Sequence, residues 1–386
     1  MAVAEEVVDE VEFEPRTTSL ELFFDLVFVF AITQVTGFVT HDPTWTGLVE
    51  GLAILAALWF AWESYVWLAN TAASDEGPVR VVLLAAMGAV LIASLAVPHA
   101  FGADGLVFGL AYFATRTMHL VAYAIVGRDD PGLRRLVGRL ASTMVPAAAL
   151  IVVAGALDGV AQAVCWIAAL AIDYGGLVAR GVEGWRVKPG HFAERHGLII
   201  IIALGESIVA IGVGANGLEL DAGIVAAALF GIAVSAAMWW AYFDFVALIA
   251  ESRLRSLPRP EQVLAARDSY NYLHLPMVVG IVLFAFGVKT TLAHVDHHLD
   301  TVPAVALCGG PALYFLALSA FKRRNLGSFN LPRLAAATAL VVLAPIATAI
   351  PGLLALALVA LVSCGLVAYE TVHYAEARNR ARHPVA

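Results

Sequence analysis

The stretch RTTSLELFFDLVFVFAITQVTGF, residues 16–38, decides the fold class of this chain. Residues 20–39 are long and apolar enough to cross a bilayer as a helix. The segment nevertheless carries two carboxylates, Glu21 and Asp25, whose i and i+4 spacing puts them on one helical face. A charge at this depth is costly and normally faces the protein interior, a partner group or water. We therefore predict a membrane helix that buries its acidic face in the protein.

The composition of the whole chain predicts a polytopic membrane protein. Of its 386 residues 61% are hydrophobic and 14% are charged, and the mean hydropathy is +0.83. These values lie outside the range of soluble globular domains. Windows of about nineteen residues indicate about twelve membrane helices in an all-α integral membrane protein. They lie near residues 20–39, 48–69, 80–98, 106–126, 140–157, 160–178, 197–214, 223–249, 272–292, 302–321, 333–350 and 353–372.

The basic residues predict the orientation of these helices. If the twelve predicted helices cross the membrane one after another, nearly all of the 23 Lys and Arg residues fall on one side of it. That side is the cytosol, so we predict cytosolic N- and C-termini in a multi-pass protein of the bacterial plasma membrane. The N-terminal residues are acidic instead of basic, which argues against a cleaved signal peptide. The net charge of −8 gives no indication of nucleic-acid binding.

The two halves of the chain resemble each other. WFAWESYVWLA from Trp59 is similar to WWAYFDFVALI from Trp239, and Asp25 in the first helix aligns with Glu206 in the seventh. An even number of spans per repeat gives both repeats the same orientation, a plan that many transporters and channels use. The predicted organisation is an acidic cytosolic tail (1–17), a first six-helix repeat (18–178), a basic cytosolic linker (179–196), a second parallel six-helix repeat (197–372) and a cytosolic tail (373–386).

Two motifs carry a resemblance to a known family. LELFFDLVFVFAITQ (20–34) together with ERHGLIIIIALGESIVAIG (194–212) resembles the bacterial low-temperature-requirement A (LtrA) family, and the resemblance extends from Arg16 to the last helix. It implies a bacterial membrane protein of a family named for a growth phenotype, without assigned catalytic residues. More distantly, the F-x-D pattern at Phe23 and Asp25 is similar to the first helix of potassium channels with an F-S-D signature, with Phe24 in place of the serine.

Acidic residues outnumber basic ones inside the predicted spans, and such groups are functional candidates. We predict Asp25 and Glu206 as the ion- or substrate-binding pair, and Arg116 as a counter-ion that sets their pKa. The other acids in the spans are Glu21, Glu63, Asp173 and Asp244, with Glu63 and Asp244 lining the cytosolic mouth. The structural alternative is that Arg116 pairs with Glu206 or Asp25 and only holds helices together.

Two further sequence features, a histidine pair and the known cofactor motifs, were considered for a functional site. His294 and His298 are spaced i, i+4 and could hold a metal or sense pH, but a solvated polar loop is the simpler interpretation. No phosphate-binding loop, nucleophile elbow or zinc-protease motif is found, so we expect no cofactor.

Three functions remain open from the sequence. The first is a transporter or channel for a cation, a proton or a small solute that uses the intramembrane carboxylates. The second is a non-transporting membrane protein for envelope or cold adaptation, a scaffold or sensor. The third is a membrane-embedded lipid-modifying enzyme. The expected partners are the lipid bilayer and a cation, proton or small solute, and the sequence leaves open whether the chain forms an oligomer.

Overall fold

The computed structural model describes residues 17–71, 77–179, 181, 184–244 and 246–376 of the chain. A helix lies over each predicted span: α1 (Ser19–His41), α2 (Trp45–Thr71), α3 (Gly77–Ala96), α4 (Gly105–Val126), α5 (Pro131–Ala154), α6 (Gly159–Ala179), α7 (Pro189–Gly214), α8 (Ala222–Phe243), α11 (Leu273–Ala293), α12 (Thr301–Leu326), α13 (Leu331–Ala347) and α14 (Gly352–His373). Short elements complete the fold: η1 (Val97–His99), α9 (Val246–Ser256), α10 (Arg259–Ala265) and the π-helical η2 (Ala266–Tyr272).

The helices have the length and composition of membrane spans. Within the described residues, ten helical segments are long and apolar enough to cross a bilayer. The 17-residue α13 is a shorter apolar helix, and α4 is outside that set as well. Many of their apolar side chains face outward, Val160 and Ile167 on α6 among them, as expected of a lipid-facing surface. The prediction of an all-α polytopic membrane protein is confirmed.

Helix α1 begins at a capping box. The Thr18 hydroxyl accepts a hydrogen bond from the backbone N–H of Glu21, and the Glu21 carboxylate accepts one from the backbone N–H of Thr18. Such a reciprocal pair satisfies two backbone donors that a helix start leaves open. Glu21 is therefore fixed at the first turn of α1, on the same face as Asp25.

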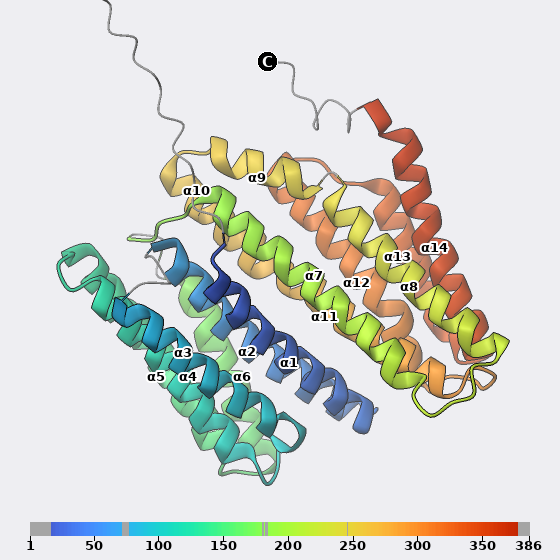
Figure 1. The fold of residues 1–386 in the computed structure, drawn as a ribbon, viewed down its shortest axis with the longest axis horizontal. Helices are drawn as coiled ribbons and strands as arrows, with labels where there is room; N and C mark the ends of the chain where they lie inside the picture. Colours follow the sequence, from blue (N-terminus) through green and yellow to red (C-terminus); the bar gives the residue numbers. More distant parts are fainter. Residues whose placement is uncertain (1–16, 72–76, 180, 182–183, 245, 377–386) are drawn as a thin grey trace, which may run out of the picture.

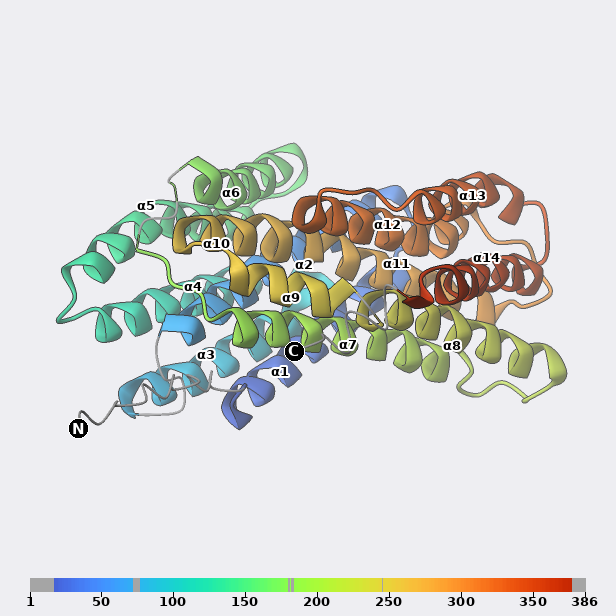
Figure 2. The same ribbon diagram turned by 90° about the horizontal axis from the view of Figure 1, so that it is seen from above.

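The two halves of the chain pack in the same order. In each half the first helix lies against the second and third helices, and the third packs along the fourth: α1 with α2 and α3 in one half, α7 with α8 and α11 in the other. Figure 1 shows α1 and α7 side by side and running in the same direction, with α3 to α6 on the α1 side and α8 and α12 to α14 on the α7 side. Figure 2, from above, places α2 and α11 between the outer helices of the two halves. Such matching order is what a duplication produces, and the parallel repeat stays a prediction.

Helices α11 and α12 approach each other closely, with glycine on both sides of the contact. A Cβ atom added to Gly280 would lie 2.6 Å from the carbonyl oxygen of Gly310, and a Cβ atom on Gly310 would lie 2.6 Å from the carbonyl oxygen of Gly280. Small residues allow helix backbones in membranes to approach closely where apolar burial gives no preference for protein over lipid. These glycines therefore fix the spacing of the two helices.

Several predicted span boundaries differ from those of the helices, and α5 begins at Pro131 instead of residue 140. Helix α7 begins at Pro189 instead of residue 197, so 189–196, predicted as linker, forms the first two turns of a helix. Proline suits the first helical position because its missing N–H has no partner there. The predicted span 223–249 is interrupted after Phe243, where α8 ends with Asp244 as its C-cap, and α9 follows. Residues 1–16 and 377–386, which form most of the predicted tails, lie outside the described residues.

Candidate functional site

A ladder of ionisable side chains joins α1 to α7. The Glu21 carboxylate lies 2.9 Å from Nε2 of His191, and the Arg195 guanidinium lies 2.6 Å from Oδ1 of Asp25 and 3.7 Å from Oε2 of Glu21. All four side chains are buried. The two residues of each close pair are 170 positions apart in the sequence. Because this separation is the same for both pairs, α1 and α7 run in the same direction (Figure 1).

Helix α2 closes the ladder from a second side. The indole Nε1 of Trp62 donates to Oδ1 of Asp25 at 2.8 Å, and the Arg195 guanidinium lies 5.8 Å from the Trp62 ring centroid. Oδ2 of Asp25 has no hydrogen-bond partner in the described part of the chain. Asp25 thus ties together three helices, two from the first half and one from the second.

Glu63 of α2 and His196 of α7 form a second contact between the halves. Nε2 of His196 lies 2.6 Å from Oε1 of Glu63, and Nδ1 lies 2.8 Å from the carbonyl oxygen of Phe192. A carbonyl oxygen only accepts, so Nδ1 carries a hydrogen. The short contact then holds one further proton, which belongs either to the carboxyl group or to the imidazole. In both forms the pair is neutral, which suits side chains that are 2% and 0% exposed.

Arg116 of α4 lies in a neighbouring cluster. Its guanidinium donates to Asp173 of α6 at 2.8 Å, to the Ser64 hydroxyl at 2.8 Å and to the Phe60 carbonyl oxygen at 3.0 Å. The Tyr112 hydroxyl donates to the other oxygen of Asp173 at 3.1 Å. The partner of Arg116 is therefore Asp173, and the pairing with Glu206 or Asp25 that the sequence left open is wrong.

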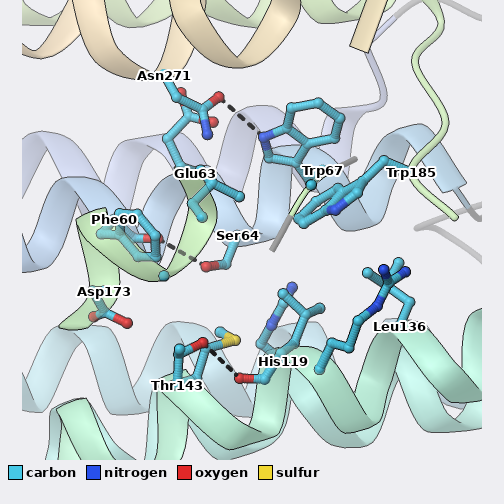
Figure 3. A pocket seen from close by; sticks show the side chains of 16 residues that line it. Phe60, Glu63, Ser64, Trp67, His119, Leu136, Thr143, Asp173, Trp185 and Asn271 are labelled. Atoms are coloured by element: carbon cyan, nitrogen blue, oxygen red, sulfur yellow. Dashed lines mark hydrogen bonds between the residues drawn. The ribbon is translucent and has the colours of Figure 1, made fainter. Parts of the chain in front are cut away.

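A cavity of about 40 Å³ is lined by Glu63 of the pair and by Ser64 and Asp173 of the Arg116 cluster. Figure 3 shows Glu63 and Ser64 on one wall and His119 on the opposite wall, with Trp67 and Trp185 at one end. Oε2 of Glu63 makes no hydrogen bond within the described residues, and neither ring nitrogen of His119 makes one of regular geometry, although the backbone of Ser64 lies within reach of the ring. A space of this size holds about three water molecules. The cavity thus presents unsatisfied polar atoms to a small ligand or water.

The π-helical segment η2 also contacts the first half. Nε1 of Trp59 donates to the backbone oxygen of Asn271, and Nε1 of Trp67 donates to its side-chain oxygen, both at 3.0 Å. Asn271 lines the cavity as well. Single π-helical turns occur frequently at functional sites. Two tryptophans of α2 therefore anchor this irregular turn beside Glu63.

Glu206 lies apart from Asp25. It is buried on α7, where the Thr33 hydroxyl donates to its Oε2 at 2.5 Å, with Thr36 and Lys289 nearby. Eleven residues separate it from Arg195, which is about 16 Å along the helix axis. No hydrogen bond or ion pair in the described part of the chain joins Asp25 and Glu206, so the structure does not bring this predicted pair together directly.

The remaining candidates lie at the edges. Asp244 is half-buried and forms the C-cap of α8. His294 and His298 are exposed on the connection between α11 and α12. Among the described residues, no group of three or more His, Cys, Asp or Glu side chains could hold a metal ion.

Three buried residues were not predicted as site residues from the sequence: His191 and Arg195 of the ladder between α1 and α7, and His196, which contacts Glu63. They were assigned to the cytosolic linker because they precede the apolar run of α7. One signal could have found two of them: the i, i+4 spacing of His191 and Arg195 matches that of Glu21 and Asp25, as expected of two helices paired in register.

The fold and this buried site define a polytopic all-α membrane protein with ionisable groups between its helices. Residues 16–368 match the family described as bacterial low temperature requirement A protein (LtrA), and the chain belongs to this family. The chain is 31% identical to an uncharacterized protein, RA0937, of Rhizobium meliloti (strain 1021). The similarity extends over 315 residues, which cover 78% of this chain and 76% of the relative. No solved structure matches the chain significantly.

Proposed function

We propose that this LtrA-family protein is a membrane transporter or channel that binds protons at its buried carboxylates and moves protons, cations or a small solute. The observation that carries the proposal is the Glu63–His196 pair, a carboxyl group and an imidazole 2.6 Å apart where α2 of the first half meets α7 of the second. Ionisable groups within membrane spans commonly serve as proton relays or ion sites.

The position of the pair supports a transport role. Any shift of α7 against α2 lengthens the contact between Nε2 of His196 and Oε1 of Glu63. A longer contact leaves Glu63 as a buried acid beside the cavity without its proton-sharing partner, and this changes its proton affinity. A movement between the halves would in this way bind or release a proton, which is the coupling that an alternating-access transporter needs.

One observation favours a second function, a non-transporting scaffold. Arg195 and Arg116 are each held by buried acids, and such closed ion pairs hold helices together without moving charge. The scaffold predicts that neutral substitution of Glu63 leaves all measurable activity of the folded protein unchanged.

Proton flux into proteoliposomes tests the proposal. The purified protein is reconstituted with a pH-sensitive dye inside the vesicles, and a pH gradient is imposed with the membrane voltage clamped. We expect flux in the wild type, loss of flux in Glu63→Gln, and wild-type flux in the control Glu50→Gln on the same helix. The double variant Asp25→Asn/Glu206→Gln tests the pair predicted from the sequence. A folded, reconstituted wild type without flux of protons or of any cation tested would overturn the proposal in favour of the scaffold.

A further inference from the structure

We propose that the cavity beside Glu63 binds a small hydrogen-bond-donating cation, ammonium or methylammonium, in exchange for the proton that Glu63 shares with His196. This inference rests on the proposed proton-binding role of that pair and adds the class of cation that competes for it. The cavity is the space of about 40 Å³ lined by residues of α2, α4, α5, α6, the α6–α7 connection and η2.

The acceptors in the cavity come from opposite walls. Oε2 of Glu63 has no hydrogen-bond partner in the described structure, and Glu63 itself is 2% exposed. His119 points into the cavity from the facing helix, as Figure 3 shows. The backbone of Ser64 lies within reach of one ring nitrogen, which leaves the lone pair of the other as an acceptor. A cation in the cavity can therefore donate hydrogen bonds to Glu63 and His119 together.

The neighbouring acid is already occupied. Both oxygens of Asp173 accept hydrogen bonds, one from Arg116 and one from Tyr112, so this ion pair is neutral as a whole. Arg139 lines the cavity but is engaged in an interaction of its own. Glu63 is therefore the acid in the cavity wall that a cation can neutralise.

The lining selects ammonium over an alkali metal ion. Sodium and potassium ions require a shell of several oxygen ligands, whereas here an imidazole nitrogen and three aromatic side chains take up much of the wall, those of Phe60, Trp67 and Trp185. Ammonium-type cations donate N–H groups to nitrogen and oxygen acceptors alike and are attracted to aromatic faces. Space for about three water molecules admits methylammonium and excludes tetramethylammonium, which also has no N–H to donate.

The exchange balances charge and protons. Before binding, Glu63 and His196 together are neutral and hold one shared proton. After binding, Glu63 is a carboxylate, His196 keeps only its Nδ1 hydrogen, the cation supplies one positive charge, and one proton leaves for water. The charged and titratable groups that surround Glu63 are Arg116 and His119 of α4, Arg139 of α5, Asp173 and Tyr174 of α6, and Arg195 and His196 of α7. Because protons and the cation compete, binding weakens about tenfold for each pH unit below the pKa of the pair.

Calorimetric titration of the purified protein in detergent tests this inference. Methylammonium chloride is titrated in two buffers of different ionisation enthalpy, which reports the number of protons released, and potassium, sodium and tetramethylammonium chlorides are titrated in parallel. We expect saturable methylammonium binding with release of about one proton and no saturable binding of the other three. His119→Leu is expected to weaken methylammonium binding about 10- to 100-fold. His119→Gln keeps a hydrogen-bond acceptor and should therefore bind more tightly than His119→Leu. The control His99→Gln, at an exposed histidine, should leave binding unchanged.

The outcomes separate this inference from the proposed function. Proton flux in vesicles without saturable methylammonium binding in detergent overturns the cation site and leaves the proposed function standing. Equal binding of potassium and methylammonium, or methylammonium binding that His119→Leu and Glu63→Gln both leave unchanged, overturns it as well. Methylammonium binding with proton release in a protein that moves neither protons nor any cation tested, methylammonium included, keeps the site and overturns transport.

Discussion

Arg195 of α7 lies 2.6 Å from Asp25 of α1, and this buried ion pair joins the two halves of the chain. One helical turn earlier on each helix, Glu21 and His191 make a second contact at 2.9 Å. Two pairs with the same i, i+4 spacing therefore interlock along one interface. A shift of either helix by one turn would leave at most one such pair, so the two pairs together favour this register of α1 against α7.

Arg195→Gln is expected to destabilise the protein by about 3–5 kcal/mol, because it leaves Glu21 and Asp25 buried beside each other without their shared cation. Denaturant titration in detergent, followed by tryptophan fluorescence, measures the loss. The control is Arg255→Gln, which breaks an exposed i, i+4 pair with Glu251 and should cost about 0.5 kcal/mol or less. Similar losses in the two variants would contradict the structural role of the buried ladder.

Gly310→Ala is expected to destabilise the α11–α12 pair by about 1–3 kcal/mol, because the new methyl group would meet the backbone of Gly280. Gly365→Ala on α14 is the matched control. No atom lies within 4 Å of a Cβ added there, so alanine should be neutral or stabilising by up to about 1 kcal/mol through its higher helix propensity. Thermal unfolding of the two variants in the same detergent compares them. If Gly310→Ala proved as stable as Gly365→Ala, the close approach of the two helices would be wrong.

Asn271→Leu is expected to cost about 1–3 kcal/mol, since the Trp67 indole N–H would lose its buried acceptor. The backbone oxygen that binds Trp59 remains in this variant, so the two tryptophans can be told apart. Replacing Trp67 by Phe in the same chain removes the unsatisfied donor and should make the second substitution less costly than it is alone. Strictly additive losses in a double-mutant cycle would argue against the contact.

The start of α5 should respond to pH through Asp130. Its side chain accepts hydrogen bonds from the backbone N–H groups of Gly132 and Leu133, which, with a smaller contribution from Arg186, lower the pKa of Asp130 below its usual value. A group with a lowered pKa in the folded state stabilises that state above its unfolded pKa and loses this contribution as pH falls through the folded pKa. We therefore expect acidification below about pH 4 to weaken the cap. Asp130→Asn, which keeps an acceptor but does not titrate, should remove this part of the pH dependence of thermal unfolding.

Much of the fold could be predicted because a membrane helix is recognisable from the apolar composition of a short stretch of sequence. Each apolar window of the sequence corresponds to a helix, and the family was recognisable from two motifs. The start of α7 was missed for a physical reason. Polar side chains such as His191 and Arg195 count as loop in a hydropathy window, yet they are buried here because acids on α1 compensate them.

The candidate site could be predicted only in part. Glu63 was among the intramembrane acids found in the sequence, but its partner His196 lies 133 positions away. Likewise, Arg116 was recognised as a buried cation, while Asp173 as its partner depends on how α4 and α6 pack. Which acid meets which base is set by tertiary packing, which a single sequence does not record.

A double-mutant cycle of proton flux tests the central claim, that Glu63 and His196 bind one proton as a unit. Flux into proteoliposomes is measured for Glu63→Gln, His196→Gln and the double variant, with thermal unfolding as a check that each is folded. We expect that either single substitution abolishes flux and that the double substitution is no worse, because the effects of groups that act as one unit are strongly non-additive. Wild-type flux in folded Glu63→Gln, or independent partial losses that multiply in the double variant, would contradict it.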